Sequence, residues 1–112
     1  MASNAETAEQ IIRIFAVVSV RENRVWMTYK ALAEALGRPG QQRLLQGALD
    51  VVRDICRDRG LPDLAVCIVS EDSVKAGTLL PASGAIQKYG GIPAIRRAQA
   101  EVLCFDWAAY RF

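Results

Sequence analysis

Glutamine and arginine side chains gather in one stretch of the chain, directly around a break that holds two glycines and a proline. The stretch reads GRPGQQRLLQ over residues 37–46. Glutamine and arginine form bidentate hydrogen bonds with base edges, and arginine also neutralises phosphate. The side chains that we expect on this face are Arg38, Gln41, Gln42, Arg43, Gln46 and Arg53. They predict a nucleic-acid-binding surface, and an ordinary solvated helix face is the alternative.

The start of the preceding helix extends this predicted surface. Thr28, Tyr29 and Lys30 stand there together, and we expect them to anchor a backbone phosphate. The positive end of the helix that follows Gly40 points toward the same ligand.

Residues for catalysis or metal binding are sparse. The chain has no histidine, which removes the commonest general base and a common metal ligand. Its cysteines, Cys56, Cys67 and Cys104, lack C-x-x-C spacing and stand in apolar contexts, so we expect buried, reduced thiols without metal. The glycines of YGGIP precede a helix but lack a phosphate-loop motif. We therefore expect no enzymatic activity and no cofactor.

A row of carboxylates recurs at i, i+4 spacing, formed by Asp50, Asp54 and Asp58. Such a row resembles an acid–base or metal cluster. Arg53 and Arg57 interleave with it at pairing distance, however, and this pattern favours a salt-bridged surface.

Two helices with a sharp turn between them position the predicted surface. Thr28 is suited to cap the first helix, whose apolar stripe is Ala31, Leu32, Ala35 and Leu36. Gly37 is suited to end it, and Pro39 forbids its continuation. The second helix has the longer apolar stripe, with members Leu44, Leu45, Ala48, Leu49, Val52, Ile55 and Cys56, and it stops at Gly60. This layout is typical of a helix-turn-helix.

The flanking segments complete a small domain. Residues 3–20 predict a helix with a Ser3–Glu6 capping box, although its end, FAVVSV, is also strand-like. Residues 64–69 predict a buried strand, 71–77 a turn and 78–80 a returning strand, which together would form a wing. Residues 82–93 read as a loop, and Pro93 suits the first turn of a last helix. Trp26 and the aromatic tail are expected to pack on the core.

Composition and charge fit one soluble domain spanning residues 1–112. The chain is 52% hydrophobic, yet no apolar run is long enough for a membrane span and no signal peptide is visible, so we expect a cytoplasmic protein. Residues 13–59 hold nine Lys or Arg against five Asp or Glu, a local +4, whereas the two signs balance from residue 60 onward. Eleven of the fourteen basic residues are arginine, which suits phosphate recognition.

The central helices also carry a family resemblance. TYKALAEALG followed by QRLLQGAL resembles the C-terminal winged-helix domain of alkylguanine-DNA alkyltransferases and alkyltransferase-like proteins, over roughly residues 24–70. The resemblance implies that Tyr29 helps to rotate a nucleotide and that Arg43 fills the vacated space in the duplex. The family's P-C-H-R-V site falls where this chain has LAVCIV, so the alkyl-accepting chemistry is absent. Leu44 and Gln46 replace small residues of the family's recognition helix.

Together these features predict an α+β fold, a mainly helical winged helix-turn-helix with a small β-hairpin. The leading hypothesis is a non-enzymatic protein that binds double-stranded DNA, as a small regulator or mobile-element accessory factor, through a recognition helix near residues 41–59. The alternative is a protein-interaction module, such as a small phage-type inhibitor of a nucleic-acid-handling host defence complex. The two differ in salt dependence, because DNA binding that releases counterions weakens steeply as salt rises.

Overall fold

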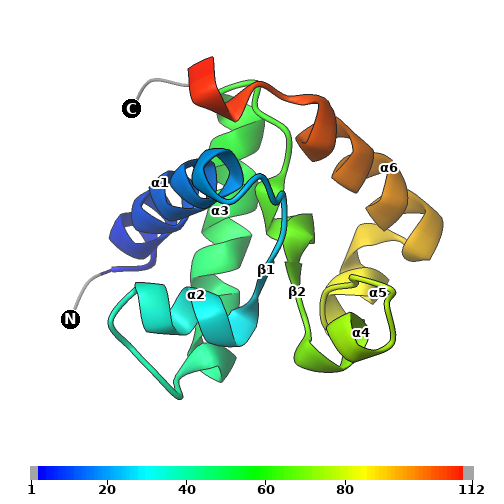
Figure 1. Ribbon diagram of the computed structural model, residues 1–112, viewed down its shortest axis with the longest axis horizontal. Helices are drawn as coiled ribbons and strands as arrows, with labels where there is room; N and C mark the ends of the chain where they lie inside the picture. The colour runs from blue at the N-terminus through cyan, green and yellow to red at the C-terminus, as the bar shows by residue number, and fades with distance from the viewer. Residues whose placement is uncertain (1–2, 110–112) are drawn as a thin grey trace.

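The computed structural model describes residues 3–109, which form an α+β fold of helices around a very short parallel sheet (Figure 1). In chain order the elements are α1 (Asn4–Arg21), β1 (Met27–Thr28), α2 (Tyr29–Ala35), the 3-10 helix η1 (Gln42–Leu45), α3 (Gln46–Asp58), the 3-10 helix η2 (Leu64–Cys67), β2 (Ile68–Val69), α4 (Glu71–Lys75), α5 (Ser83–Tyr89), α6 (Ile92–Cys104) and the 3-10 helix η3 (Trp107–Ala109). Over the described residues, no helix is both long and apolar enough to span a membrane.

Helix α1 forms as its N-terminal signal predicts. The Ser3 hydroxyl accepts a hydrogen bond from the Glu6 amide at 3.1 Å and donates one to the Glu6 carboxylate at 3.2 Å. The helix continues to Arg21, so the strand-like end FAVVSV is helical. Its inner face buries Ile11, Ile12 and Phe15, whereas Val17 is half exposed.

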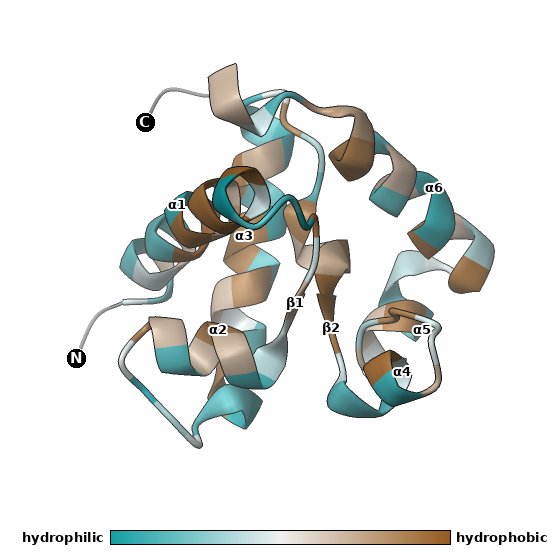
Figure 2. Ribbon diagram, in the orientation of Figure 1, coloured by the Kyte–Doolittle hydropathy of each residue, from teal (hydrophilic) through white to brown (hydrophobic). Residues whose placement is uncertain are grey.

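The core lies where α1 packs across α3, and both helices carry brown, hydrophobic segments in Figure 2. Leu49, Val52 and Cys56 of α3 are at most 4% exposed. The ring of Trp107 closes one end of this core, with its edge against Phe15 at a centroid distance of 5.4 Å.

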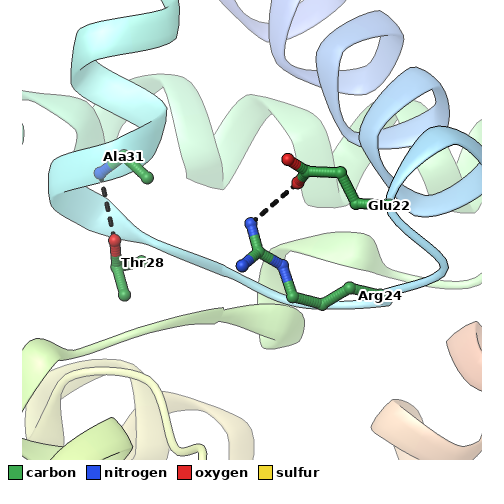
Figure 3. Close-up of polar contacts among 4 residues, drawn as sticks. All are labelled: Glu22, Arg24, Thr28 and Ala31. Carbon is green, nitrogen blue, oxygen red and sulfur yellow. Dashed lines mark hydrogen bonds and ion pairs between the residues drawn. The ribbon is translucent and has the colours of Figure 1, made fainter.

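Two helical segments with a turn between them stand where the sequence predicts them: α2, a turn over residues 36–41, and η1 followed by α3. The Thr28 hydroxyl accepts a hydrogen bond from the Ala31 amide at 3.0 Å, which caps α2 (Figure 3). Gly37 stands after the last turn with a φ of +75°, as a glycine that ends a helix does. Helix α2 buries Leu32 and Ala33, whereas Ala35 is exposed, so the inner face lies slightly off the predicted stripe.

The predicted β-hairpin is wrong. The described sheet pairs β1 with β2 in parallel, Met27 opposite Ile68 and Thr28 opposite Val69, and residues 64–67 form a 3-10 turn. The segment expected as a turn forms α4. Residues 78–80 are not a strand, because Leu79 has a φ of +51°, which lies outside the strand region. The Leu80 carbonyl accepts hydrogen bonds from the Ser70 amide at 3.0 Å and the Ser73 hydroxyl at 2.9 Å, and Gln99 donates to the Leu79 carbonyl at 2.9 Å.

The C-terminal part is more helical than predicted. The expected loop contains α5, which ends at Gly90 in a left-handed conformation. Helix α6 begins with Pro93 in its first turn, as the sequence predicts, and it buries Ile95, Ala98 and Val102.

One substitution tests the position of α3 in this core. Leu49 is 4% exposed, so we expect Leu49→Ala to lower the free energy of unfolding by about 2–4 kcal/mol through lost burial and a residual cavity. Leu44 is 71% exposed, and Leu44→Ala is the matched control, with an expected change within about 0.5 kcal/mol. Chemical denaturation measures both, and equal effects of the two substitutions would contradict this helix phase.

Candidate nucleic-acid interface

The nine residues predicted to contact nucleic acid divide into two groups in the structure. Lys30, Gln41 and Arg43 are exposed near the start of the helix-turn-helix elements. The other six are at least partly covered or engage other parts of the protein; they are Thr28, Tyr29, Arg38, Gln42, Gln46 and Arg53.

The exposed group stands on the first turn of the second helix and beside it. This helix starts as the 3-10 turn η1 at Gln42 and becomes α-helical at Gln46, close to the predicted start. Helix α2, which carries Lys30, packs against η1, so Lys30, Gln41 and Arg43 belong to neighbouring elements. Leu44 follows Arg43 and is 71% exposed, although we expected it in the apolar stripe. Together, Lys30, Gln41, Arg43 and Leu44 define what we call the first-turn surface.

Several of the other predicted residues hold the fold. The hydroxyl of Thr28 caps α2, and the guanidinium of Arg38 donates to the Thr7 hydroxyl at 3.3 Å, which ties the turn to α1. Gln46 donates to the Asp50 carboxylate at 3.0 Å. The Oε1 atom of Gln42 is buried, so this side chain is not presented to solvent in the way the sequence suggests.

Tyr29, Gln46 and Arg53 line a cleft bounded by α3, η2 and α5, with an empty volume of about 430 Å³ that includes space open to solvent. The Tyr29 hydroxyl accepts a hydrogen bond from the Ala82 amide at 3.0 Å, and burial raises the pKa of this phenol. The Arg53 guanidinium lies over the ring of Tyr89, 4.9 Å from its centroid. Both groups are therefore fixed as walls of the cleft.

Asp63 and Tyr89 also line this cleft, and sequence reasoning missed both. Burial raises the pKa of the Asp63 carboxyl, although the Ala65 amide, the Arg53 charge and the Tyr89 hydroxyl all favour its ionised form. Burial also raises the pKa of Tyr89, and the Asp63 charge adds to this effect. The one signal in the sequence was Asp63 itself, because an aspartate before a short apolar run is a typical cap, and its side chain accepts from the Ala65 amide.

The carboxylate row of α3 lies on the surface, with basic neighbours. Arg57 approaches Asp54 at 3.2 Å and Asp58 at 3.9 Å, and Lys88 of α5 approaches Asp50 at 3.9 Å. The predicted salt-bridged surface is therefore confirmed at Arg57, whereas the second predicted partner, Arg53, stacks on Tyr89.

Two of the cysteines are buried as expected, but Cys104 is exposed. Burial raises the pKa of Cys56 to about 11 and that of Cys67 to about 12, so both are protonated near neutral pH. Among residues 3–109, no group of three or more His, Cys, Asp or Glu side chains is placed to hold a metal ion.

These thiols should differ in reactivity. At pH 8 we expect the native chain to react rapidly with a disulfide reagent at Cys104 alone, because the other two thiols are shielded and protonated. Cys104→Ser should abolish the rapid phase, and denaturant should release the reaction of Cys56 and Cys67. Rapid native labelling that persists in Cys104→Ser would show that a buried thiol is accessible.

Asp63 should make stability depend on pH. Because its pKa is raised in the folded state, its contribution to stability is fully present below the unfolded pKa and is lost as pH rises through the folded pKa. We therefore expect Asp63→Asn to gain stability relative to the wild type as pH rises from about 3 to about 7. Thermal melts across this range measure the difference, and Asp106→Asn serves as an exposed control. If Asp63→Asn instead loses stability relative to the wild type at the higher pH, the pKa of Asp63 is not raised in the folded state.

No protein-family model, curated protein or solved structure matches this chain.

Proposed function

We propose that this protein binds double-stranded DNA through its first-turn surface. The observation that carries the proposal is the exposed guanidinium of Arg43 at the start of a helix-turn-helix, beside the exposed amide of Gln41. These are the two side-chain types that form bidentate contacts with base edges. Lys30, on the neighbouring α2, supplies a further positive charge for a phosphate.

The charge around these helix starts favours an anionic partner. Helices α1 and α4 each carry acidic residues in their first turn, which offset the positive end of the helix dipole. Helix α2, η1 and α3 have none in theirs. No first-turn carboxylate therefore offsets the charges of Lys30 and Arg43 at these helix starts.

The resemblance to alkyltransferases supports the same surface. Arg43 occupies the position of the family's recognition-helix arginine and is exposed, as a residue that enters a duplex must be. The alkyl-accepting step is not part of this proposal, because the matching segment forms η2 with a buried Cys67 whose pKa is raised by burial to about 12. Such a thiol is protonated and shielded, and it is a poor nucleophile.

A protein partner is the second candidate, and Leu44 favours it. A leucine that is 71% exposed beside an arginine can serve as an apolar anchor with a charged neighbour, a combination that protein interfaces use. Binding of this kind buries apolar area and depends weakly on salt, unlike contacts with phosphate.

Arg43→Ala tests the proposal. We expect weaker binding to a labelled duplex by roughly 1–3 kcal/mol, because a guanidinium contact with a base edge or phosphate is lost. The melting temperature should stay nearly unchanged, because the side chain is exposed. Fluorescence anisotropy at low and moderate salt provides the measurement.

Arg57→Ala is the matched control, because Arg57 stands at the far end of the same helix among carboxylates. It should leave duplex binding nearly unchanged. If the wild type shows no salt-sensitive binding, or if both variants bind alike, the DNA-binding proposal fails and the protein-partner candidate takes its place.

A further inference from the structure

A second surface lies away from the helix-turn-helix, at the C-terminal ends of α1 and α6. A groove with an empty volume of about 690 Å³, partly open to solvent, runs between these ends and η3. Its lining includes Val20, Arg24, Val25, Leu103, Phe105 and Asp106. No residue of α2, η1 or α3 lines it, so an occupant of the groove would leave the first-turn surface uncovered.

Exposed apolar side chains concentrate on this face. Val20 is 53% exposed and Leu103 is 64% exposed, and both line the groove. Val17 is 50% exposed and stands one helical turn before Val20, on the same side of α1. Two of the five large hydrophobic residues that are exposed among the described residues therefore line this groove, and a third stands one turn away on α1. Such clustering marks interaction surfaces, whereas single exposed hydrophobic residues need no explanation.

The charges in the groove are of opposite sign. Arg24 has its guanidinium 4.7 Å from the ring centre of Trp26 and pairs with Glu22 at 3.0 Å (Figure 3), while its buried Nε has no acceptor among the described residues. Asp106 is exposed, and no side-chain partner for its carboxylate is found within residues 3–109. One cation and one anion thus share the groove with an apolar strip.

We propose that this groove is the interface of a symmetric dimer, and that its occupant is a second copy of this chain. A twofold interface brings the same patch of both chains together, so it must be complementary to itself. A groove with Arg24 and Asp106 meets this requirement, because Arg24 of each copy faces Asp106 of the other. A groove of one charge would repel its own copy. The exposed apolar side chains of Val20 and Leu103, which line the groove, are buried in the same step.

The size of the patch sets the expected strength. Stable interfaces bury about 800 Å² per partner, and three exposed side chains with their neighbours fall short of a large, obligate interface. The dimer is therefore reversible and dissociates on dilution. It presents two first-turn surfaces, which is how dimeric helix-turn-helix proteins engage two half-sites. The interface itself does not depend on DNA binding.

Sedimentation velocity of the full chain, from low micromolar to near-millimolar concentration, tests the proposal. The wild type should shift from monomer to dimer as concentration rises. Leu103→Asp should weaken association at least about tenfold, because each dimer places two charges in an apolar contact. Leu44→Asp is the matched control, since Leu44 is similarly exposed but lies outside the groove, and it should dimerise as the wild type does.

Charge reversal tests the pairing itself. Asp106→Arg alone and Arg24→Glu alone should each weaken dimerisation, and the double variant should restore it, because the opposite charges then meet again with their positions exchanged. Circular dichroism melts confirm that each variant is folded. A wild type that stays monomeric at every concentration overturns the proposal, and so does equal weakening by Leu103→Asp and Leu44→Asp. If Arg24→Glu does not fold, the comparison of dimerisation between Leu103→Asp and Leu44→Asp decides whether the proposal holds.

Discussion

The packing of α3 across α1 is the contact on which the rest of the structure depends. Helix α3 buries Leu49, Val52 and Cys56 on one side, and its carboxylates and arginines stay in water on the other. Leu45, at the end of η1, is 1% exposed, so the same core holds the start of the helix. This anchoring fixes where Arg43 stands. A side chain that is itself exposed is therefore positioned by residues that are not.

Local signals account for the parts of the fold that were predictable. Capping residues at Ser3 and Thr28, and Pro93 in the first turn of α6, act within one helical turn, so the sequence alone specifies those starts. The pairing of β1 with β2 joins residues about forty positions apart and is only two residues long, so no local pattern announces it. The predicted hairpin failed for a related reason: Leu79 adopts a φ of +51°, and Gln99, twenty residues further along the chain, donates to its carbonyl.

In the candidate site, too, features set by local sequence were predictable and features set by distant contacts were not. The exposure of Arg43 could be predicted, because it depends on the phase of a single helix. The predicted apolar stripe fails at Leu44, which is exposed. The reason is that η1 is a 3-10 turn, whose residues advance around the helix axis by about 120° rather than 100°. The cleft was not predictable, because Tyr29, Asp63 and Tyr89 reach it from three separate segments. The stacking of Arg53 on Tyr89 likewise requires α5, which the sequence suggested was a loop.

The binding role proposed for the first-turn surface and the stability of its helix make different demands on the sequence. A carboxylate in the first turn stabilises a helix, and α1 and α4 use one. The start of the second helix in the helix-turn-helix instead has an exposed arginine, an exposed leucine and no side-chain cap for η1 or α3. Neither exposed side chain contributes to the core, and the missing cap costs about 1 kcal/mol relative to a capped start. The packing of Leu45 and Leu49 offsets that cost, and the positive charge of Arg43 stays exposed at the surface.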